Sequence, residues 1–138
     1  MFICDISILH RYGKQALDET LRPLALTWQE AVLLIALERI PQVDLQLLSQ
    51  MLQTDKGNVS RLLKSMEHRG LLLRRTLAHD ARRKEMVIAP KGESLLPQVQ
   101  DIMRQWEQRC YQGLSEEQIQ QYLSLSKTII RNIYPGRY

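Results

Sequence analysis

Residues that commonly bind metal ions are few in this sequence. Its 138 residues include two cysteines and three histidines. The cysteines lie far apart, and neither they nor the histidines have the close spacing that metal ligands need. We therefore expect no metal site and a reducing, cytoplasmic setting. The residues concerned are Cys4, Cys110, His10, His68 and His79.

Long apolar runs are missing too. No stretch approaches the roughly 20 apolar residues that span a bilayer. The N-terminus carries its positive charges after, and not before, a very short apolar run, unlike a secretion signal. No internal repeat or Gly/Ser-rich linker divides the chain, and no nucleophile–base pair, paired carboxylates or phosphate loop is visible. We therefore expect a soluble protein that is not an enzyme and has no cofactor.

The chain is long enough for one domain with a real core and too short for two, since 44% of its 138 residues are hydrophobic. We predict a single domain over residues 1–138. Its formal charge of +4 is unevenly spread: residues 54–91 hold ten basic and four acidic residues, so this segment is +6 and the remainder is −2. Segregated positive charge favours a polyanionic partner, because each neutralised phosphate releases counterions. The alternative is a solvated surface rich in Lys and Arg.

Helical periodicity begins near the N-terminus. Apolar spacing predicts a first helix over residues 5–21, which ends before Pro23 because the residue preceding proline avoids the α region. Thr27 and Glu30 form a capping box, so a second helix is predicted from Trp28 to Ile40.

Two shorter helices follow. Asp44 caps the third helix, whose Leu45, Leu48 and Met51 are expected to face inward. Thr54 or Asp55 then caps a fourth helix that runs to Arg69, with Gly70 as its left-handed stop. Two helices joined by a turn of three or four residues form a helix-turn-helix.

The fourth helix has an apolar face and a cationic face on a helical wheel. Residues near the start of such a helix reach deepest into a DNA major groove. The alternative is an ordinary amphipathic surface helix. The candidate contacts to base edges or phosphates are Lys56, Gly57, Asn58, Ser60, Arg61 and Lys64.

A hairpin is predicted next, because the apolar runs 71–73 and 86–88 flank a polar stretch. This wing carries three cations at its predicted tip, where an arginine can enter the narrow minor groove. Asp80 is expected to hold Arg82 in an extended pose by ion pairing. The candidate wing contacts are Arg82, Arg83 and Lys84.

Three segments, and with them essentially the whole chain, resemble the MarR family of winged helix-turn-helix transcriptional regulators. The segments are LTWQEAVLLIAL at 26–37, NVSRLLKSMEHRGLLLR at 58–74 and DARRKEMVIAPKG at 80–92. The family's Asp-x-Arg wing motif is matched by Asp80 and Arg82, and its later strand and glycine by Ile88 and Gly92. Ala89 replaces the family's capping threonine, which removes a cap and leaves the DNA site untouched.

The resemblance implies a mainly α fold of the α+β class, with a winged helix-turn-helix lobe at 26–92 between dimerisation helices at 1–24 and 93–138. It also implies a homodimer that binds a pseudo-palindromic double-stranded operator. Many members release DNA when a small phenolic or lipophilic ligand binds between the dimer helices and the lobe. We therefore predict a sequence-specific DNA-binding regulator, a dimeric repressor relieved by a small molecule.

Ser115 with Gln118 forms another capping box, which predicts a last helix after it. Apolar stripes on this helix and on the first helix support the dimer independently, since a small winged domain could not bury them alone. Such stripes indicate a partner surface or a folded-back bundle. Two other functions stay open. One is a winged-helix protein-interaction module without DNA binding. The other is a thiol sensor using Cys4, by resemblance to the hydroperoxide-sensing branch of the family; Cys110 is expected to be a small core or interface residue.

Several side chains could supply aromatic walls and a charge for an acidic effector. Each could equally be a packing or surface residue of its helix. The candidate pocket residues are His10, Tyr12, Trp28, Arg39 and His68.

Overall fold

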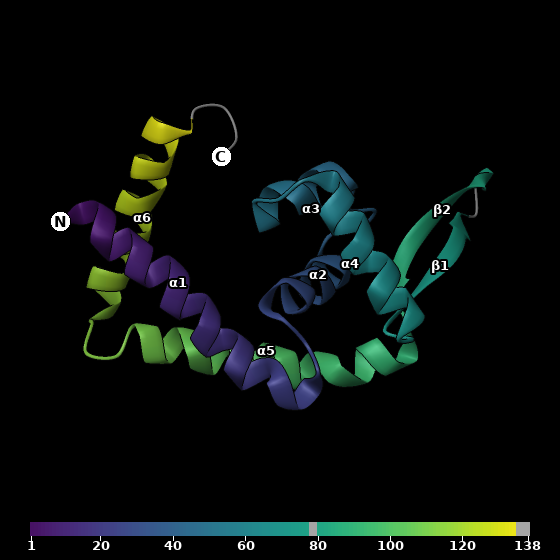
Figure 1. The fold of residues 1–138 in the computed structure, drawn as a ribbon, viewed down its shortest axis with the longest axis horizontal. Coiled ribbons are helices and arrows are strands. Elements are labelled where there is room, and N and C mark those ends of the chain that lie inside the picture. The colour runs from purple at the N-terminus through teal and green to yellow at the C-terminus, as the bar shows by residue number, and fades with distance from the viewer. Residues whose placement is uncertain (78–79, 135–138) are drawn as a thin grey trace. The chain divides into compact units, whose positions relative to one another are not determined.

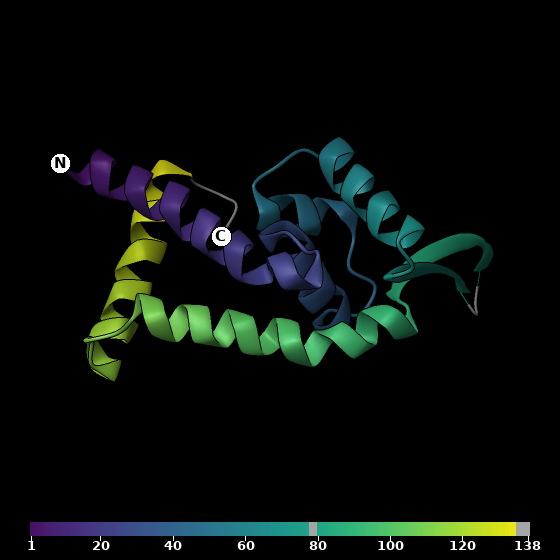
Figure 2. The same ribbon diagram turned by 60° about the horizontal axis from the view of Figure 1, so that its bottom comes forward.

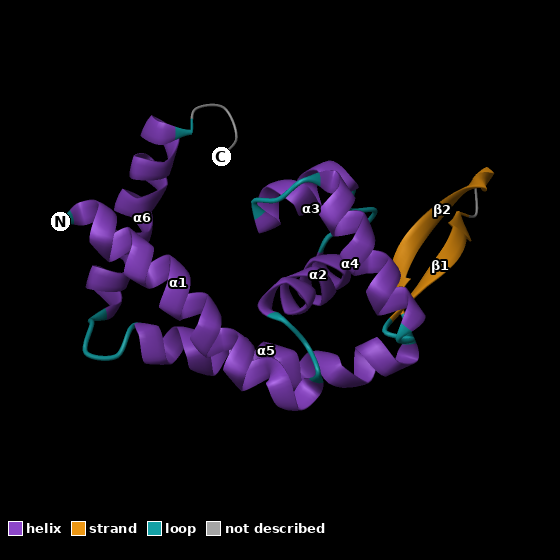
Figure 3. Ribbon diagram, viewed as in Figure 1, coloured by secondary structure: helices purple, strands orange, loops and turns teal. Residues whose placement is uncertain are grey.

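The computed structural model describes the backbone of residues 1–77 and 80–134, and the side chains of residues 1–76 and 85–134. Within these residues the fold consists of helices and one two-stranded antiparallel sheet (Figures 1 and 3), which confirms the predicted fold class. Two units divide the chain, Met1–Met103 and Arg104–Tyr138. The elements are α1 (Phe2–Leu21), the 3-10 turn η1 (Arg22–Leu24), α2 (Trp28–Arg39), α3 (Leu45–Leu52), α4 (Lys56–His68), β1 (Leu72–Leu77), β2 (Asp80–Ile88), α5 (Pro90–Cys110) and α6 (Glu116–Ile133).

Side-chain caps fix where the helices of the first unit begin. In α2, Thr27 Oγ1 accepts a hydrogen bond from the Glu30 amide at 3.3 Å, and Glu30 Oε2 accepts one from the Thr27 amide at 2.9 Å. These two bonds complete the predicted capping box. Asp44 caps α3, and Asp55 caps α4 by accepting from the Asn58 amide at 2.8 Å. Of the two residues proposed to cap α4, it is therefore Asp55 that does so.

The core of the first unit lies among the end of α1, α2, α3, α4 and the start of β1 and α5. Of the apolar residues that the helical wheel places on the inner face of α4, Val59, Leu63 and Met66 are buried and Leu62 is half-buried, while Gly70 follows the helix with φ +75°. The apolar stripe of α4 lies in this core, so α4 is anchored on one face and free on the other. The fully buried large side chains are Leu21, Leu33, Leu34, Leu48, Val59, Met66, Leu72 and Val99.

In α3 the inward face differs from the prediction. Leu48 is buried as expected, but Leu45 and Met51 are 38% and 40% exposed, so their predicted inward orientation was wrong. The buried residues instead include Ser49 and Leu52. A helix of two turns presents only a narrow stripe to its neighbours, and this stripe lies one residue further along the chain than we predicted.

The wing is a longer hairpin than the sequence predicts. β1 continues past Leu73 to Leu77, and β2 already begins at Asp80. The residues added to the two strands, 74–77 and 80–85, are mostly polar. The register pairs Thr76 with Lys84 and then Leu77 with Asp80, so residues 81–83 form a bulge in β2. At the base of the wing, Ala89 N donates to Leu71 O at 3.0 Å.

α5 starts directly beneath this base. A Cβ at the buried Gly92 would lie 2.3 Å from Leu71 O and 2.8 Å from the Ile88 Cγ2 methyl group. No real side chain tolerates such contacts. The glycine therefore lets the first turn of α5 approach the backbone of the wing, and the wing emerges beside the end of α4 (Figure 2).

The second unit holds the end of α5 and α6. Ser115 and Gln118 complete the predicted capping box at the start of α6. No residue of α6 is buried. Tyr111 and Tyr122 meet edge to face, with ring centroids 6.3 Å apart. No helix in the described parts of the chain is long and apolar enough to cross a membrane.

Candidate nucleic-acid interface

The outer face of α4 presents a cluster of cations. Lys56, Arg61 and Lys64 are exposed, while Asn58 and Ser60 are half-buried beside them. They face outward because the opposite stripe of the same helix is held in the core. This arrangement leaves ammonium and guanidinium groups on the face of α4 that does not pack against the core.

Hydrogen bonds order the first turn of this face. Thr54 Oγ1 accepts from Asn58 Nδ2 at 3.1 Å, and Asn58 Oδ1 accepts from Arg61 Nη2 at a long 3.5 Å. A Cβ at Gly57 would lie 2.9 Å from the capping carboxylate of Asp55, so alanine there would crowd the cap. The start of α4 thus combines a cap at Asp55, a small residue at Gly57 and, in the second turn, Arg61, which one long hydrogen bond holds.

Two arginines at the base of the wing are paired with carboxylates, which sequence reasoning missed. Arg74 Nε donates to both carboxylate oxygens of Glu67 at 3.1 Å. Arg75 donates to Glu85 Oε1 from Nε at 2.9 Å and from Nη2 at 2.6 Å. Arg75 and Glu85 are directly opposite in the sheet, so a correct register would have revealed this pair. The other pair joins a helix to a strand and has no local signal.

The outer wing differs from the prediction. Arg82, Arg83 and Lys84 belong to β2 and not to a hairpin tip, so their predicted tip position was wrong. The pairing of the two strands continues beyond these residues, because backbone hydrogen bonds hold the strands together there. The polar side chains of this stretch gave no sequence signal for a strand. Asp80 lies at the start of β2. The side chains of these four residues are outside the described part of the chain, so the Asp80–Arg82 ion pair stays a prediction.

The predicted effector-pocket residues lie on several helices. His10 and Tyr12 are exposed on α1, Arg39 is exposed at the end of α2, and His68 is exposed in the last turn of α4. Trp28 is half-buried at the start of α2, where Lys14 Nζ lies 4.6 Å from its ring centroid. His10 Nε2 lies 2.8 Å from the same ammonium group.

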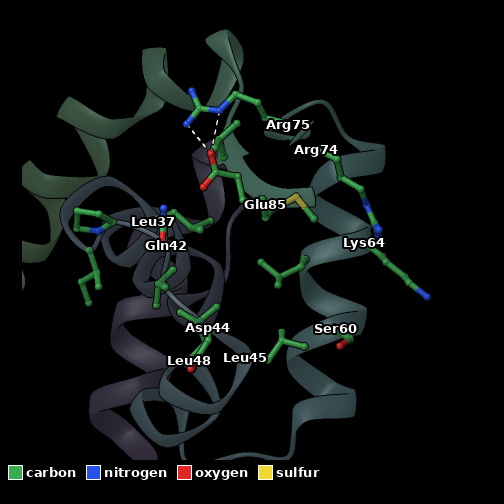
Figure 4. A pocket seen from close by; sticks show the side chains of 16 residues that line it. Leu37, Gln42, Asp44, Leu45, Leu48, Ser60, Lys64, Arg74, Arg75 and Glu85 are labelled. Carbon is green, nitrogen blue, oxygen red and sulfur yellow. Dashed lines mark hydrogen bonds and ion pairs between the residues drawn. The ribbon is translucent and has the colours of Figure 1, made fainter. Parts of the chain in front are cut away.

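A cavity of about 780 Å³ lies elsewhere, between the α2–α3 connection, α3, α4 and the base of the wing (Figure 4). None of the five predicted pocket residues lines it. Its walls include leucines from α2, α3 and α4, and its rim carries both signs of charge. Four separate segments build it, namely 37–48, 60–64, 74–75 and 85–87, so no local pattern could reveal it. The polar residues of its lining are Gln42, Asp44, Ser60, Lys64, Arg74, Arg75 and Glu85.

The two cysteines are free and exposed. The expectation that Cys110 could be a core residue was therefore wrong for this chain; its role at an interface stays a prediction. Partial desolvation raises the pKa of the Cys110 thiol above 9.0, with Arg109 opposing the shift and Glu107 adding to it. Among the described residues, no three His, Cys, Asp or Glu side chains lie together as a metal site needs.

An exposed cationic helix packed beside a β-hairpin defines a winged helix-turn-helix protein. A sequence model of the MarR family matches residues 26–83 of this chain. This match covers the helix-turn-helix and the start of the wing, and it confirms the resemblance predicted from the sequence.

Solved structures extend the likeness of fold along the chain. MepR of S. aureus, in a complex with DNA, is 22% identical with a TM-score of 0.85, over 96% of each chain. A MarR transcriptional regulator from Methanosarcina mazei Go1 is 23% identical with a TM-score of 0.77, over 95% of each chain. CouR from Rhodococcus jostii RHA1, bound to p-coumaroyl-CoA, is 20% identical with a TM-score of 0.78, over 95% of this chain and 90% of CouR.

Proposed function

We propose that this protein is a sequence-specific double-stranded DNA-binding transcriptional regulator, a homodimeric repressor that a small molecule releases from its operator. The observation that carries the proposal is the free cationic face of α4 beside the wing, in a segment that a sequence model of the MarR family matches. The DNA complex of MepR, which has the same fold, supports it. As a regulator of chromosomal genes, the protein would act in the cytoplasm.

In this proposal α4 enters the major groove. Lys56 and Lys64 bind phosphates, and Arg61 reaches base edges from a pose that Asn58 guides. Gly57 and Ser60 allow close approach of the helix to the groove. These roles follow from exposure and order in the first two turns, where a recognition helix contacts bases.

The outer wing is proposed to follow the DNA backbone into the adjacent minor groove. Arg82 and Arg83 lie in the bulge of β2, and Lys84 directly follows it. A bulge re-aims side chains away from the regular pleat, which suits arginines that must leave the sheet to reach a narrow groove. Asp80 is proposed to orient Arg82.

The dimer is proposed to form through helices at 1–24 and 93–138. Phe2, Ile3 and Leu9 of α1 are exposed, as are Leu125 and Ile133 of α6, although all are large apolar side chains. Several exposed apolar side chains on one helix mark an interaction site. Two-fold symmetry then requires a pseudo-palindromic operator, with half-sites about 34 Å apart.

The effector is proposed to be a small acid with an apolar body that binds in the cavity beside α4. Apolar walls formed by residues such as Leu48 and Leu63 suit the body, and Lys64 and Arg74 at the rim suit a carboxylate. Such a ligand competes with phosphates for Lys64. CouR, which shares the fold, holds an acyl-CoA. The alternative effector site is the predicted set on α1, α2 and α4, namely His10, Tyr12, Trp28, Arg39 and His68.

Fluorescence polarisation against salt concentration tests the proposal. The full chain is titrated onto the intergenic duplex upstream of its own gene and onto a shuffled duplex of equal length. We expect tighter binding to the first, with log K falling steeply as log salt rises. Lys64→Ala should reduce the slope by about 0.9 for each phosphate that the side chain no longer neutralises.

Arg39→Ala is the matched control, because Arg39 is an exposed cation at the end of α2, outside α4, the wing and the proposed dimer helices, and no effector is present in the titration. It should leave both affinity and slope unchanged. Equal affinity for the two duplexes would contradict sequence-specific regulation. A flat salt dependence would instead favour a protein-interaction module, and loss of binding only after oxidation, prevented by Cys4→Ser, would favour a thiol sensor.

A further inference from the structure

Arg69, the residue after α4, joins the end of the recognition helix to the start of α2. Its Nη1 donates to Ala25 O at 2.7 Å, and its Nη2 donates to Glu30 Oε1 in an ion pair. Its own carbonyl accepts from Lys91 Nζ at 3.0 Å. We call Arg69, Glu30 and the Ala25 carbonyl the Arg69 clamp. It connects residues 39 and 44 positions apart in the sequence.

The same carboxylate also holds the first turn of α2. Glu30 Oε2 accepts from the Thr27 amide at 2.9 Å, while Oε1 takes the guanidinium of Arg69. One residue further on, Asp18 of α1 accepts from the Trp28 amide at 2.6 Å. Arg69 is therefore bound to the start of α2 through Glu30, and the start of α2 is in turn bound to α1 through Asp18.

The physical chemistry of the clamp favours a role in orientation. Glu30 is buried, and a buried carboxylate is costly unless a cation and hydrogen bonds compensate it. Arg69 Nε is buried without a hydrogen-bond partner among the described residues, so the compensation is incomplete. A planar guanidinium that meets two acceptors fixes direction as well as distance, which a lysine ammonium does not.

We propose that Arg69 is a positioning residue for DNA binding. The clamp sets the angle at which α4 leaves the α1–α2 platform, and hence the pose in which the cationic face of α4 meets the groove. This inference rests on the proposed DNA-binding function. In this proposal Arg69 does not contact DNA. Its guanidinium donates to Glu30 and to the Ala25 carbonyl, and it affects DNA binding only through α4, which precedes it.

Contact residues and positioning residues differ in the salt dependence of binding. A residue that neutralises a phosphate lowers the slope of log K against log salt when removed. Removal of a residue that only orients the helix lowers operator affinity and leaves that slope unchanged. We expect Arg69→Met to weaken operator binding about tenfold, within the range of coupling residues, at an unaltered slope and with unchanged affinity for shuffled duplex.

Three further variants of the full chain complete the experiment. Lys64→Met, the matched contact control, should reduce both affinity and slope. Arg69→Lys keeps the charge but not the fork, so it should recover only part of the loss. Glu30→Gln keeps the α2 cap, since glutamine serves in a capping box, while it removes the ionic partner. It provides the readout if Arg69→Met does not fold.

Affinities are compared for folded protein, with the folded fraction of each variant taken from urea unfolding. Wild-type affinity in folded Arg69→Met, or in folded Glu30→Gln if the former does not fold, overturns the inference and leaves the clamp a stability element. A slope reduced as in Lys64→Met also overturns it, because Arg69 is then a phosphate contact. A wild-type chain without operator preference defeats the proposed function first, and the role proposed for Arg69 with it.

Discussion

α4 and α6 have the same kind of sequence and opposite surroundings. Both are capped amphipathic helices with a single apolar stripe. In α4 the stripe of Val59, Leu63 and Met66 is buried. In α6 no residue is buried, and Leu125 and Ile133 are 63% and 74% exposed. An apolar stripe therefore indicates that a helix packs against a partner. It does not indicate whether that partner belongs to the same chain or to another one.

The second unit is too short to bury such a stripe by itself. It runs over residues 104–138, and chains below about 40 residues rarely form a sufficient core without help. The first unit, by contrast, brings helices α1 to α4, the first part of α5 and a hairpin around one apolar core. The comparison supports a partner surface for α6, which the proposed dimer provides.

The largest expected effect comes from the buried side of this comparison. Leu34→Ala removes a fully buried side chain from α2 and should destabilise the fold by about 2–5 kcal/mol, because the cavity left behind adds to the lost transfer free energy. Leu125→Ala, the matched change in α6, should alter the stability of a dilute sample by less than about 0.5 kcal/mol. Urea unfolding followed by circular dichroism measures both. Equal losses would erase the distinction between the two helices.

A smaller effect is expected for the association of two chains. Ile129 and Ile133 are exposed, one turn apart on α6. Replacing either with serine should raise the dimer dissociation constant about tenfold, or about 1.4 kcal/mol, because apolar surface then stays in contact with water. Sedimentation equilibrium over a concentration series measures the change. Gln121→Ser, a polar residue of the same helix, is the control; an unchanged constant in both isoleucine variants would exclude α6 from the interface.

The smallest expected effect is a shift in the pKa of the Cys110 thiol, near the start of the second unit. Desolvation raises the pKa of its thiol in the folded chain, so the neutral form is favoured. The stability gained this way is present below the unfolded pKa and is lost as the pH rises through the folded pKa. In a Cys4→Ser variant, the pH midpoint of alkylation should be higher in the folded chain than in urea. A lower midpoint would mean that Arg109 outweighs desolvation.

Local signals in the sequence predicted the helices well. Caps at Thr27, Asp44 and Ser115 involve residues within one turn of one another, so the pattern contains all the information required. The inner face of α4 was predicted for the same reason. Once that inner face is assigned, helical geometry places Gly57, Arg61 and Lys64 on the opposite, outward face, whereas Lys56 and Asn58 are proposed contacts because they lie in the first turn.

Features that depend on distant residues were not predicted. The wing extends through Arg74, Arg75 and Thr76, where the strand partner and not local propensity fixes the conformation. The cavity is lined by four separate segments, and the Arg69 clamp joins residues about 40 positions apart. In the sequence Glu30 indicates only a capping box, because nothing local reveals that its second oxygen has a partner.

The bulge at residues 81–83 can be removed without shifting the register of the wing. Thr76 is paired with Lys84 on one side of it, and Leu77 with Asp80 on the other. Excising the three residues would bring these two pairs into consecutive rungs, so no other residue would change partner and the number of paired rungs would stay the same. The excision would remove Arg82 and Arg83 while keeping the length of the hairpin, and would thereby separate the contribution of these arginines from that of the hairpin itself.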